Sequence, residues 1–154
     1  MWSRKTLISL WITQELNSNT ILIGVPNKLL LKQWEEVICV LFQSVPYLIV
    51  SGGVDIENIM RFLENNQKKC IVITTYSSAH KVYTATQDTR FVFGMKILDE
   101  VHHLTTNNMR LAHTTKKYIQ IPAPLFHGFT IKPCDIFLEH HSGMYQQAYA
   151  WCVK

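Results

Sequence analysis

The stretch KILDEVHH at residues 96–103 decides the fold expected of this chain, because a strand-like apolar run passes directly into two adjacent acids, Asp99 and Glu100. The residues FVFGMKIL at 91–98 are typical of a buried strand. At the end of such a strand, one carboxylate can hold the ligand shell of a magnesium ion, and the next can orient and polarise water in nucleotide hydrolysis. A strand that ends in a solvated acidic turn has the same pattern, and spacing alone gives it roughly equal weight.

Outward from this stretch, short apolar runs alternate with helix-like segments. The runs that predict strands are TILIGV at 20–25, YLIV at 47–50 and CIVIT at 70–74. The segments that predict helices are 6–16, 28–42, 55–64 and 77–82. This alternation predicts an α/β fold with a mostly parallel sheet, helices on both faces and right-handed crossovers. Ligands of such sheets bind at the carboxyl ends of the strands, which is where the two acids lie.

The C-terminal part of the chain is less regular. A helix is expected over residues 109–118, and an extended or loop conformation over 119–130, because this second stretch contains two prolines. We expect one domain over residues 1–133 and a divergent tail over 134–154, which is aromatic and rich in histidine without a clear period.

The composition bounds the class of protein. A chain of 154 residues with 47% hydrophobic and 17% charged residues is long enough and apolar enough to bury the core of one domain, and it is not typical of disorder. No apolar run is long enough to span a bilayer, so no membrane partner is expected, and the expected location is inside the cell, in the cytoplasm or nucleus. The net charge of +4 is compatible with an anionic partner without requiring one.

Several other residues have simpler structural interpretations. Trp34 follows Leu30 and precedes Ile38 at helical spacing, so it is expected in the core rather than against a nucleic-acid base. Cys39 and Cys70 lie in apolar runs and are expected to be buried thiols. The four cysteines form no CxxC pair, and the spacing of the seven histidines matches no standard zinc site.

Three segments of the sequence resemble superfamily 2 helicases. DEVHH at 99–103 resembles the DExH box of these helicases and translocases, in the variant of their type III restriction-enzyme-like branch. VPNKLLLKQW at 25–34 resembles the motif Ia region, where a strand end and a helix start contact a nucleic-acid strand. ITTY at 73–76 resembles the TTY segment that comes between the two. The resemblance covers about residues 21–104, and three segments in the family's order are more specific than any one of them.

The resemblance implies a RecA-like three-layer sandwich and the N-terminal ATP-binding lobe of a DNA or RNA helicase, which uses ATP and Mg²⁺. SRKT at 3–6 corresponds to the end of the family's phosphate-binding loop, so Arg4, Lys5 and Thr6 are the expected cofactor-binding residues. Lys5 would contact the β- and γ-phosphates, and Thr6 would hold the magnesium ion together with Asp99.

The same resemblance implies the catalytic residues. These are Asp99, Glu100 and His102, of which Glu100 would position the attacking water and His102 would couple the nucleotide site to a third motif. That motif, GLTATP in the family, is similar to GFTIKP at 128–133, where Thr130 is the expected coupling residue.

The nucleic-acid contacts come from the strand ends. Lys28 and Lys32 lie one helical turn apart and can touch phosphates, although a solvated helix face has roughly even odds. The residues that the resemblance assigns to DNA or RNA are Pro26, Asn27, Lys28, Lys32, Thr75 and Tyr76.

The sequence also departs from the family. Arg4 stands where the family has a glycine, whose missing side chain lets backbone N–H groups approach the phosphates. The rest of that loop, the strand before it and a second helicase lobe with its arginine finger are not found in the sequence. We therefore expect a lobe truncated within its phosphate loop, with its first strand missing, and weak or absent ATPase activity in this chain alone.

Two alternatives stay open. The first alternative to a helicase lobe is a catalytically inactive nucleic-acid-binding module, which the changed phosphate loop favours. The second is a non-functional fragment of a split gene, which the divergent tail favours. An intact relative would work with a second helicase lobe or another chain. A large DNA virus or a mobile element would be a natural home for such a gene, in which case the protein would act in an infected cell.

Overall fold

The computed structural model describes residues 4–100, 118–121 and 137–138. The helices are α1 (Arg4–Glu15), α2 (Lys28–Leu41), α3 (Ile56–Asn65) and α4 (Ala79–Thr89), with a 3-10 helix, η1 (Tyr76–Ser78), before α4. The strands are β1 (Thr20–Val25), β2 (Tyr47–Val50), β3 (Cys70–Thr75), β4 (Met95–Asp99), β5 (Tyr118–Ile121) and β6 (Phe137–Leu138).

The strands form one sheet in the order β2-β3-β1-β4-β5-β6. The pairs from β2 to β5 are parallel, and β6 pairs antiparallel with β5. β1 is central, because Ile23 pairs with Ile73 of β3 on one side and with Ile97 of β4 on the other. The predicted mostly parallel sheet is confirmed.

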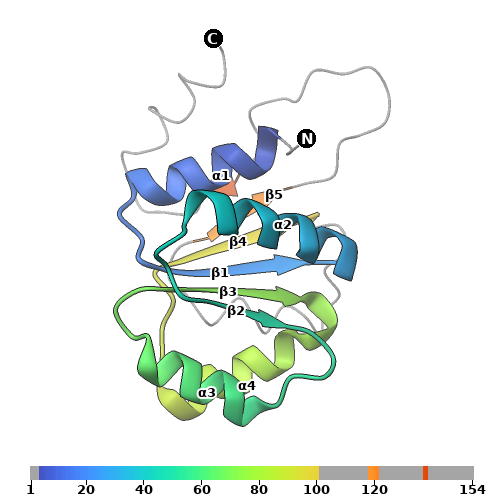
Figure 1. The fold of residues 1–154 in the computed structure, drawn as a ribbon, viewed down its shortest axis with the longest axis vertical. Helices are drawn as coiled ribbons and strands as arrows, with labels where there is room; N and C mark the ends of the chain where they lie inside the picture. The colour runs from blue at the N-terminus through green and yellow to red at the C-terminus, as the bar shows by residue number, and fades with distance from the viewer. Residues whose placement is uncertain (1–3, 101–117, 122–136, 139–154) are drawn as a thin grey trace.

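Helices cover both faces of the sheet, as predicted. Figure 1 shows α1 and α2 on one side of the strands, and α3 and α4 on the other. A separate hydrophobic cluster fills each side: one contains Trp34 of α2 and Ile23 of β1, and the other contains Leu63 of α3 and Val82 of α4. The molecule is therefore a three-layer α/β sandwich in the part of the chain that the structure describes.

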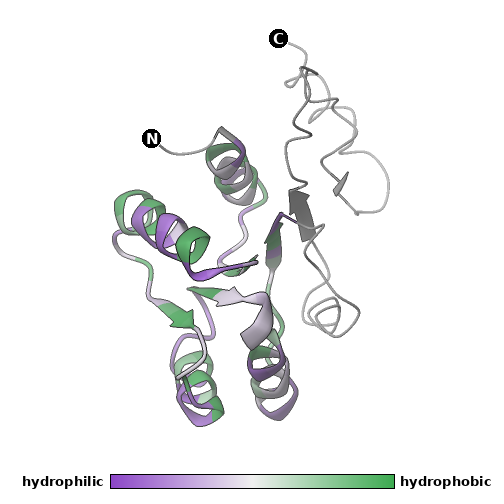
Figure 2. Ribbon diagram, turned by 90° about the vertical axis from the view of Figure 1, so that its right-hand side faces the viewer, coloured by the Kyte–Doolittle hydropathy of each residue, from purple (hydrophilic) through white to green (hydrophobic). Residues whose placement is uncertain are grey.

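The apolar strand sequences follow from this burial on two faces. Along β1, Ile21 and Ile23 belong to one cluster and Leu22 to the other, so successive positions need apolar side chains and no alternation with polar residues develops. The helices bury one side only. Figure 2 shows hydrophobic and hydrophilic residues interspersed along them, as expected for helices between a sheet and water.

The structure corrects several predicted boundaries. α1 begins two residues earlier than expected, at Arg4, and α4 extends to Thr89. β4 begins only at Met95, because Gly94 donates its backbone N–H to the hydroxyl of Thr20 before pairing with β1 starts. Tyr118 begins a strand rather than ending a helix, and most of the predicted helix 109–118 lies outside the described residues.

One predicted thiol environment is wrong. Cys70 is buried, and burial raises its pKa to about 12, as a thiol in the core requires. Cys39 is exposed, because it follows the buried Ile38 on α2 and so lies on the side of the helix that faces away from the sheet. Its sulfur lies 3.3 Å from the hydroxyl of Tyr47.

Candidate functional site

Asp99 is the last residue of β4 and is held by three groups. The indole Nε1 of Trp34 donates a hydrogen bond to its Oδ2, at 2.8 Å. The backbone N–H of Glu100 also donates to this carboxylate. The hydroxyl of Tyr76 donates to the backbone carbonyl oxygen of Asp99. With only 8% of its surface exposed, Asp99 is therefore fixed in both its side chain and its backbone.

The surroundings of Asp99 act on its charge in two directions. Burial raises the pKa of this carboxyl above its usual range, because the charged form loses hydration. The hydrogen bonds from Trp34 and Glu100 and the positive charge of Lys5 lower it. A cation bound beside the carboxylate would favour the charged form further.

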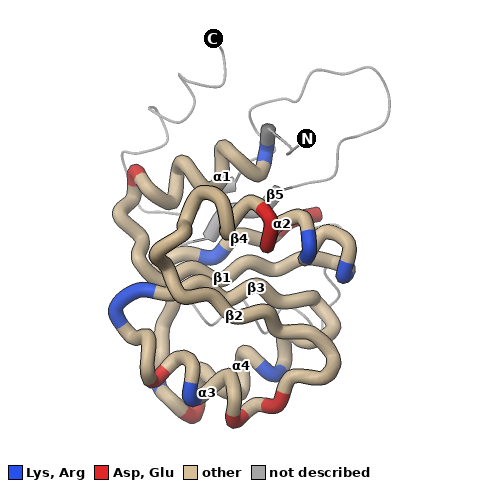
Figure 3. Tube along the Cα trace, in the orientation of Figure 1, with Lys and Arg blue, Asp and Glu red and all other residues tan. Residues whose placement is uncertain are grey.

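Lys5 and Thr6 lie in the first turn of α1, at the same edge of the sheet. Thr6 is buried and Lys5 is half-buried. The charge of Lys5 is close enough to Asp99 to lower the pKa of that carboxyl, so the structure brings together two residues from distant parts of the sequence. Figure 3 shows the basic start of α1 and the acidic end of β4 at one edge of the sheet. No acid lies in this first turn of α1, and a helix N-terminus attracts anions.

Glu100 adopts an unusual backbone conformation. Its φ angle is +53°, in the left-handed region that non-glycine residues rarely occupy. Such strain persists where the surrounding structure fixes the chain, and it is common at functional sites. The turn places the half-exposed Glu100 directly after the buried Asp99.

The expected nucleic-acid contacts divide into two groups. Asn27, Lys28 and Lys32 are exposed at the start of α2, next to the half-buried Pro26. Asn27 also caps this helix, since its side chain accepts a hydrogen bond from the backbone N–H of Leu30 at 2.9 Å. Figure 3 shows that these positive charges lie at the edge of the sheet where β4 ends.

Thr75 and Tyr76 form the second group, and their side chains are inside the protein. They are 4% and 3% exposed, and Thr75 shares a hydrogen bond with Ser77. In this conformation, these two side chains expose little surface that a nucleic-acid strand could contact. The environment of Tyr76 raises the pKa of its phenol, mainly through burial.

Trp34 is a residue of the site that sequence reasoning placed only in the core. It is in the core, but its indole N–H is polar and requires an acceptor when buried. That requirement is a signal in the sequence, although it does not identify Asp99 as the acceptor.

Two predicted site residues, His102 and Thr130, lie outside the described residues. The tail over 134–154 is likewise outside the described part, except for the two residues of β6. Arg4 is the first residue of α1.

The residues present fit a magnesium nucleotide. Mg²⁺ usually keeps several waters and takes one or two carboxylates together with phosphate oxygens of its substrate. In such a site, Asp99 would provide one carboxylate, Thr6 a hydroxyl and Lys5 a cation for phosphate. Among the described residues no group of three or more potential metal ligands occurs, so a metal cage made by protein alone is not found there.

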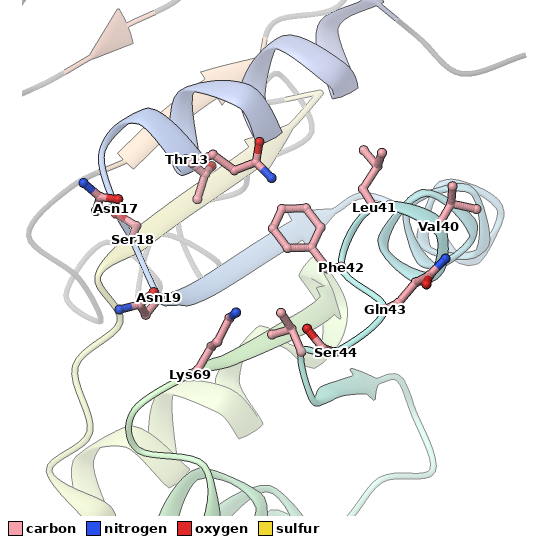
Figure 4. A pocket seen from close by; sticks show the side chains of 12 residues that line it. Thr13, Asn17, Ser18, Asn19, Val40, Leu41, Phe42, Gln43, Ser44 and Lys69 are labelled. Atoms are coloured by element: carbon pink, nitrogen blue, oxygen red, sulfur yellow. The ribbon is translucent and has the colours of Figure 1, made fainter.

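A hollow of about 700 Å³ lies at the opposite edge of the sheet (Figure 4). Asn19 and Lys69, which precede β1 and β3, line it together with Thr13, Phe42 and Ser44. None of the predicted site residues lines this hollow.

In the described part of the chain, no helix is long and apolar enough to cross a membrane.

Comparison with known proteins relates this chain to one family and to solved structures. Residues 3–130 match the family model described as "Type III restriction enzyme, res subunit". Among solved structures, the chain is similar to the "nuclease-deletion mutant of the Type ISP restriction-modification enzyme LlaGI in complex with a DNA substrate mimic", with a TM-score of 0.62 and 17% identity. That match covers 79% of this chain and 12% of the other, and it confirms the predicted RecA-like fold. No curated protein is significantly similar to this chain.

Proposed function

From the premise that this chain belongs to the family of the type III restriction enzyme res subunit, we propose that it is the ATP-binding lobe of a superfamily 2 helicase-type protein. The observation that carries the proposal is the proximity of Lys5, at the start of α1, to Asp99, at the end of β4. The family resemblance assigns the phosphates of ATP to the first residue and magnesium to the second. The fold brings these two residues together from opposite ends of the described stretch 4–100.

In the proposed site, each described residue has one task. Lys5 and the N-terminus of α1 bind the phosphate groups, and Arg4 lies beside them. Thr6 and Asp99 hold the magnesium ion, which supplies charge neutralisation to the phosphates when bound. Glu100 orients water, and its position directly after Asp99 keeps both acids at one strand end. His102 and Thr130 keep their proposed coupling roles, which the described residues do not test.

The nucleic-acid partner, DNA or RNA, is proposed to lie along the carboxyl edge of the sheet. Its phosphates would contact Lys28 and Lys32, which are exposed near Asn27 and Pro26. Thr75 and Tyr76 contribute through the position of their backbone, because their side chains are buried.

We expect weak or absent ATP hydrolysis by this chain alone. An inter-lobe site needs groups from a second lobe, which we propose as a further partner, either in a longer chain or in another one. The proposed limits remain residues 1–133 for the lobe and 134–154 for a divergent tail. Steady ATP turnover that Glu100→Gln abolishes would contradict this expectation.

The main alternative is a nucleic-acid-binding module that acts without ATP, and the exposed lysines of α2 favour it as a second candidate. A fragment without function would show neither nucleotide nor nucleic-acid binding. The two functional candidates share the surface formed by Lys28 and Lys32, here called the lysine surface, and they differ in nucleotide binding. The binding of both ligands therefore has to be measured.

Binding of a fluorescent single-stranded oligonucleotide, followed by anisotropy at several salt concentrations, tests the lysine surface. We expect Lys28→Ala/Lys32→Ala to weaken binding and to reduce the slope of log affinity against log salt by about 1.4, since each phosphate contact on a single strand contributes about 0.7. Lys68→Ala/Lys69→Ala is the matched control, because these exposed lysines precede β3 at the opposite edge. Equal losses in both double variants would show that only net charge matters and would contradict the proposed surface.

A further inference from the structure

Two segments assigned to nucleic-acid contact each place one side chain on Asp99. Trp34 comes from α2, whose first turns carry Asn27, Lys28 and Lys32, and its indole donates to Oδ2 of Asp99 at 2.8 Å. Tyr76 comes directly after β3, and its hydroxyl donates to the carbonyl oxygen of Asp99. Both contacts bridge long stretches of sequence, 65 and 23 residues respectively.

The contact through Trp34 is rigid. Its side chain is 1% exposed and packs in the cluster that also contains Ile38 of the same helix. The helix is capped at its start by Asn27, so the exposed lysines and the buried indole belong to one continuous element. A shift of α2 would therefore move or break the hydrogen bond to Asp99.

The contact through Tyr76 is also closely packed. A Cβ atom built on Gly24 would lie 3.0 Å from Cε1 of the Tyr76 ring and 2.9 Å from Cδ2 of Leu98, so β1 passes directly against the ring. The strand end that precedes Tyr76 cannot move far without moving the phenol. The backbone of Asp99 is thus tied to β3 as its side chain is tied to α2.

We propose that Trp34 and Tyr76 are positioning residues that couple the nucleic-acid surface to the carboxylate of Asp99. A nucleic-acid strand bound to α2 and to the end of β3 shifts these two elements, and the two side chains pass this shift to Asp99 and so change its orientation toward the magnesium nucleotide. The inference rests on the proposed function, since it takes Asp99 as the metal ligand. Linkage makes the coupling reciprocal, so the nucleotide must tighten nucleic-acid binding by the same factor.

The coupling is measured on the full chain as a ratio of affinities. The affinity for magnesium with a non-hydrolysable ATP analogue is determined with and without a saturating oligothymidylate of about 12 nucleotides, a length within the usual range for single-strand sites. We expect the oligonucleotide to tighten the wild-type affinity at least about fivefold, which is the lower end of typical coupling. The ratio falls close to 1 in Trp34→Phe, and Tyr76→Phe, which loses only a hydroxyl, reduces it as well.

A matched control separates coupling from stability. Ile38→Val removes a buried methyl group one turn along α2, in the same cluster as Trp34, without touching Asp99. It keeps the wild-type ratio. Wild-type ratios in both Trp34→Phe and Tyr76→Phe would overturn the inference.

A spectroscopic readout tests the inference independently of nucleotide binding. The indole ¹⁵N–¹H signal of Trp34 is assigned by its absence in Trp34→Phe, and we expect it to move when the oligonucleotide alone is added. A signal that stays in place overturns the inference. A folded wild-type chain that binds no magnesium nucleotide contradicts the proposed function instead, and the Trp34 signal then tests only the link between the nucleic-acid surface and Asp99.

Discussion

Asp99 can serve as a metal ligand only if its carboxyl is charged, and burial disfavours the charged form. Burial has the largest effect and leaves the pKa of this carboxyl raised, because the charged form loses hydration. The hydrogen bond from Trp34, the backbone N–H of Glu100 and the charge of Lys5 all act in the opposite direction and favour the charged form. Lys5 was expected near Asp99 from the sequence, whereas Trp34 was not.

The backbone of Glu100 gives a prediction about strain. Asn tolerates the left-handed region better than Glu does, so Glu100→Asn should raise the free energy of unfolding by about 0.5–1 kcal/mol. Glu100→Gln keeps the unfavourable conformation and is the control, with stability near that of the wild type. Urea denaturation measures both, and an Asn variant no more stable than the Gln variant would show that the turn is not strained.

Lys96 gives a prediction about pH. It is 1% exposed in β4, and burial lowers its pKa from 10.5 to about 8, because the charged form loses hydration. Between pH 8 and 10.5 the unfolded chain holds this proton and the folded chain does not, so this lysine makes stability rise with pH. Below pH 8 both states are protonated, and the full cost of the buried charge is present.

Lys96→Met isolates this effect from that of other groups. The wild type should gain about 2 kcal/mol relative to the variant as the pH rises from 8 to 10.5, an estimate from the size of the shift. Chemical denaturation of both proteins at pH 7, 8 and 10.5 measures it. A stability difference that is constant over this range would mean that Lys96 titrates near its ordinary value.

At the scale of elements, α2 carries both the lysines proposed to contact nucleic acid and the tryptophan that donates to Asp99. Its cap gives a direct prediction: Asn27→Ala should lower the free energy of unfolding by about 1 kcal/mol, because the N–H of Leu30 loses its acceptor. Asn27→Asp keeps an acceptor and should keep the stability. Thermal or urea denaturation measures both, and an Ala variant as stable as the wild type would show that the cap contributes nothing.

The sequence predicted the elements of the first hundred residues well, because β1, β3 and β4 are buried on both faces and so are mostly apolar. TILIGV and YLIV became β1 and β2 with the predicted bounds. The start of β4 was placed too early, because Phe93, which is apolar and buried, makes only an isolated bridge and a bend at Gly94 separates it from the strand that begins at Met95. A local pattern does not distinguish a buried residue beside a strand from one within it.

Sequence motifs pointed to some residues of the candidate site and not to others. Motifs identified Lys5, Thr6 and the two acids, and the fold brings Lys5 close to Asp99. The burial of Tyr76 and its bond to Asp99 could not be predicted, since they depend on how closely β1 passes at Gly24. Long-range packing of this kind leaves no mark in a single sequence.

At the scale of the whole molecule, one sheet separates two layers of helices, and the candidate site lies at one edge of this sandwich. The starts of α1 and α2 and the ends of β1, β3 and β4 meet at that edge (Figures 1 and 3). The alternation of strands and helices predicted this meeting point, because parallel strands end on the same side. The pairing of β5 with β4 was not predicted, since a helix was expected to end at Tyr118.

We propose above that Lys5, Thr6 and Asp99 form a magnesium nucleotide site in this chain. Calorimetric titration of the folded full chain with magnesium and a non-hydrolysable ATP analogue tests it most directly, together with Asp99→Ala, Lys5→Met and the remote control Lys69→Met. We predict binding by the wild type and the control, weaker binding by Lys5→Met and none by Asp99→Ala. A folded wild-type chain that binds no nucleotide, or an Asp99→Ala variant that binds as well as the wild type, would contradict the account.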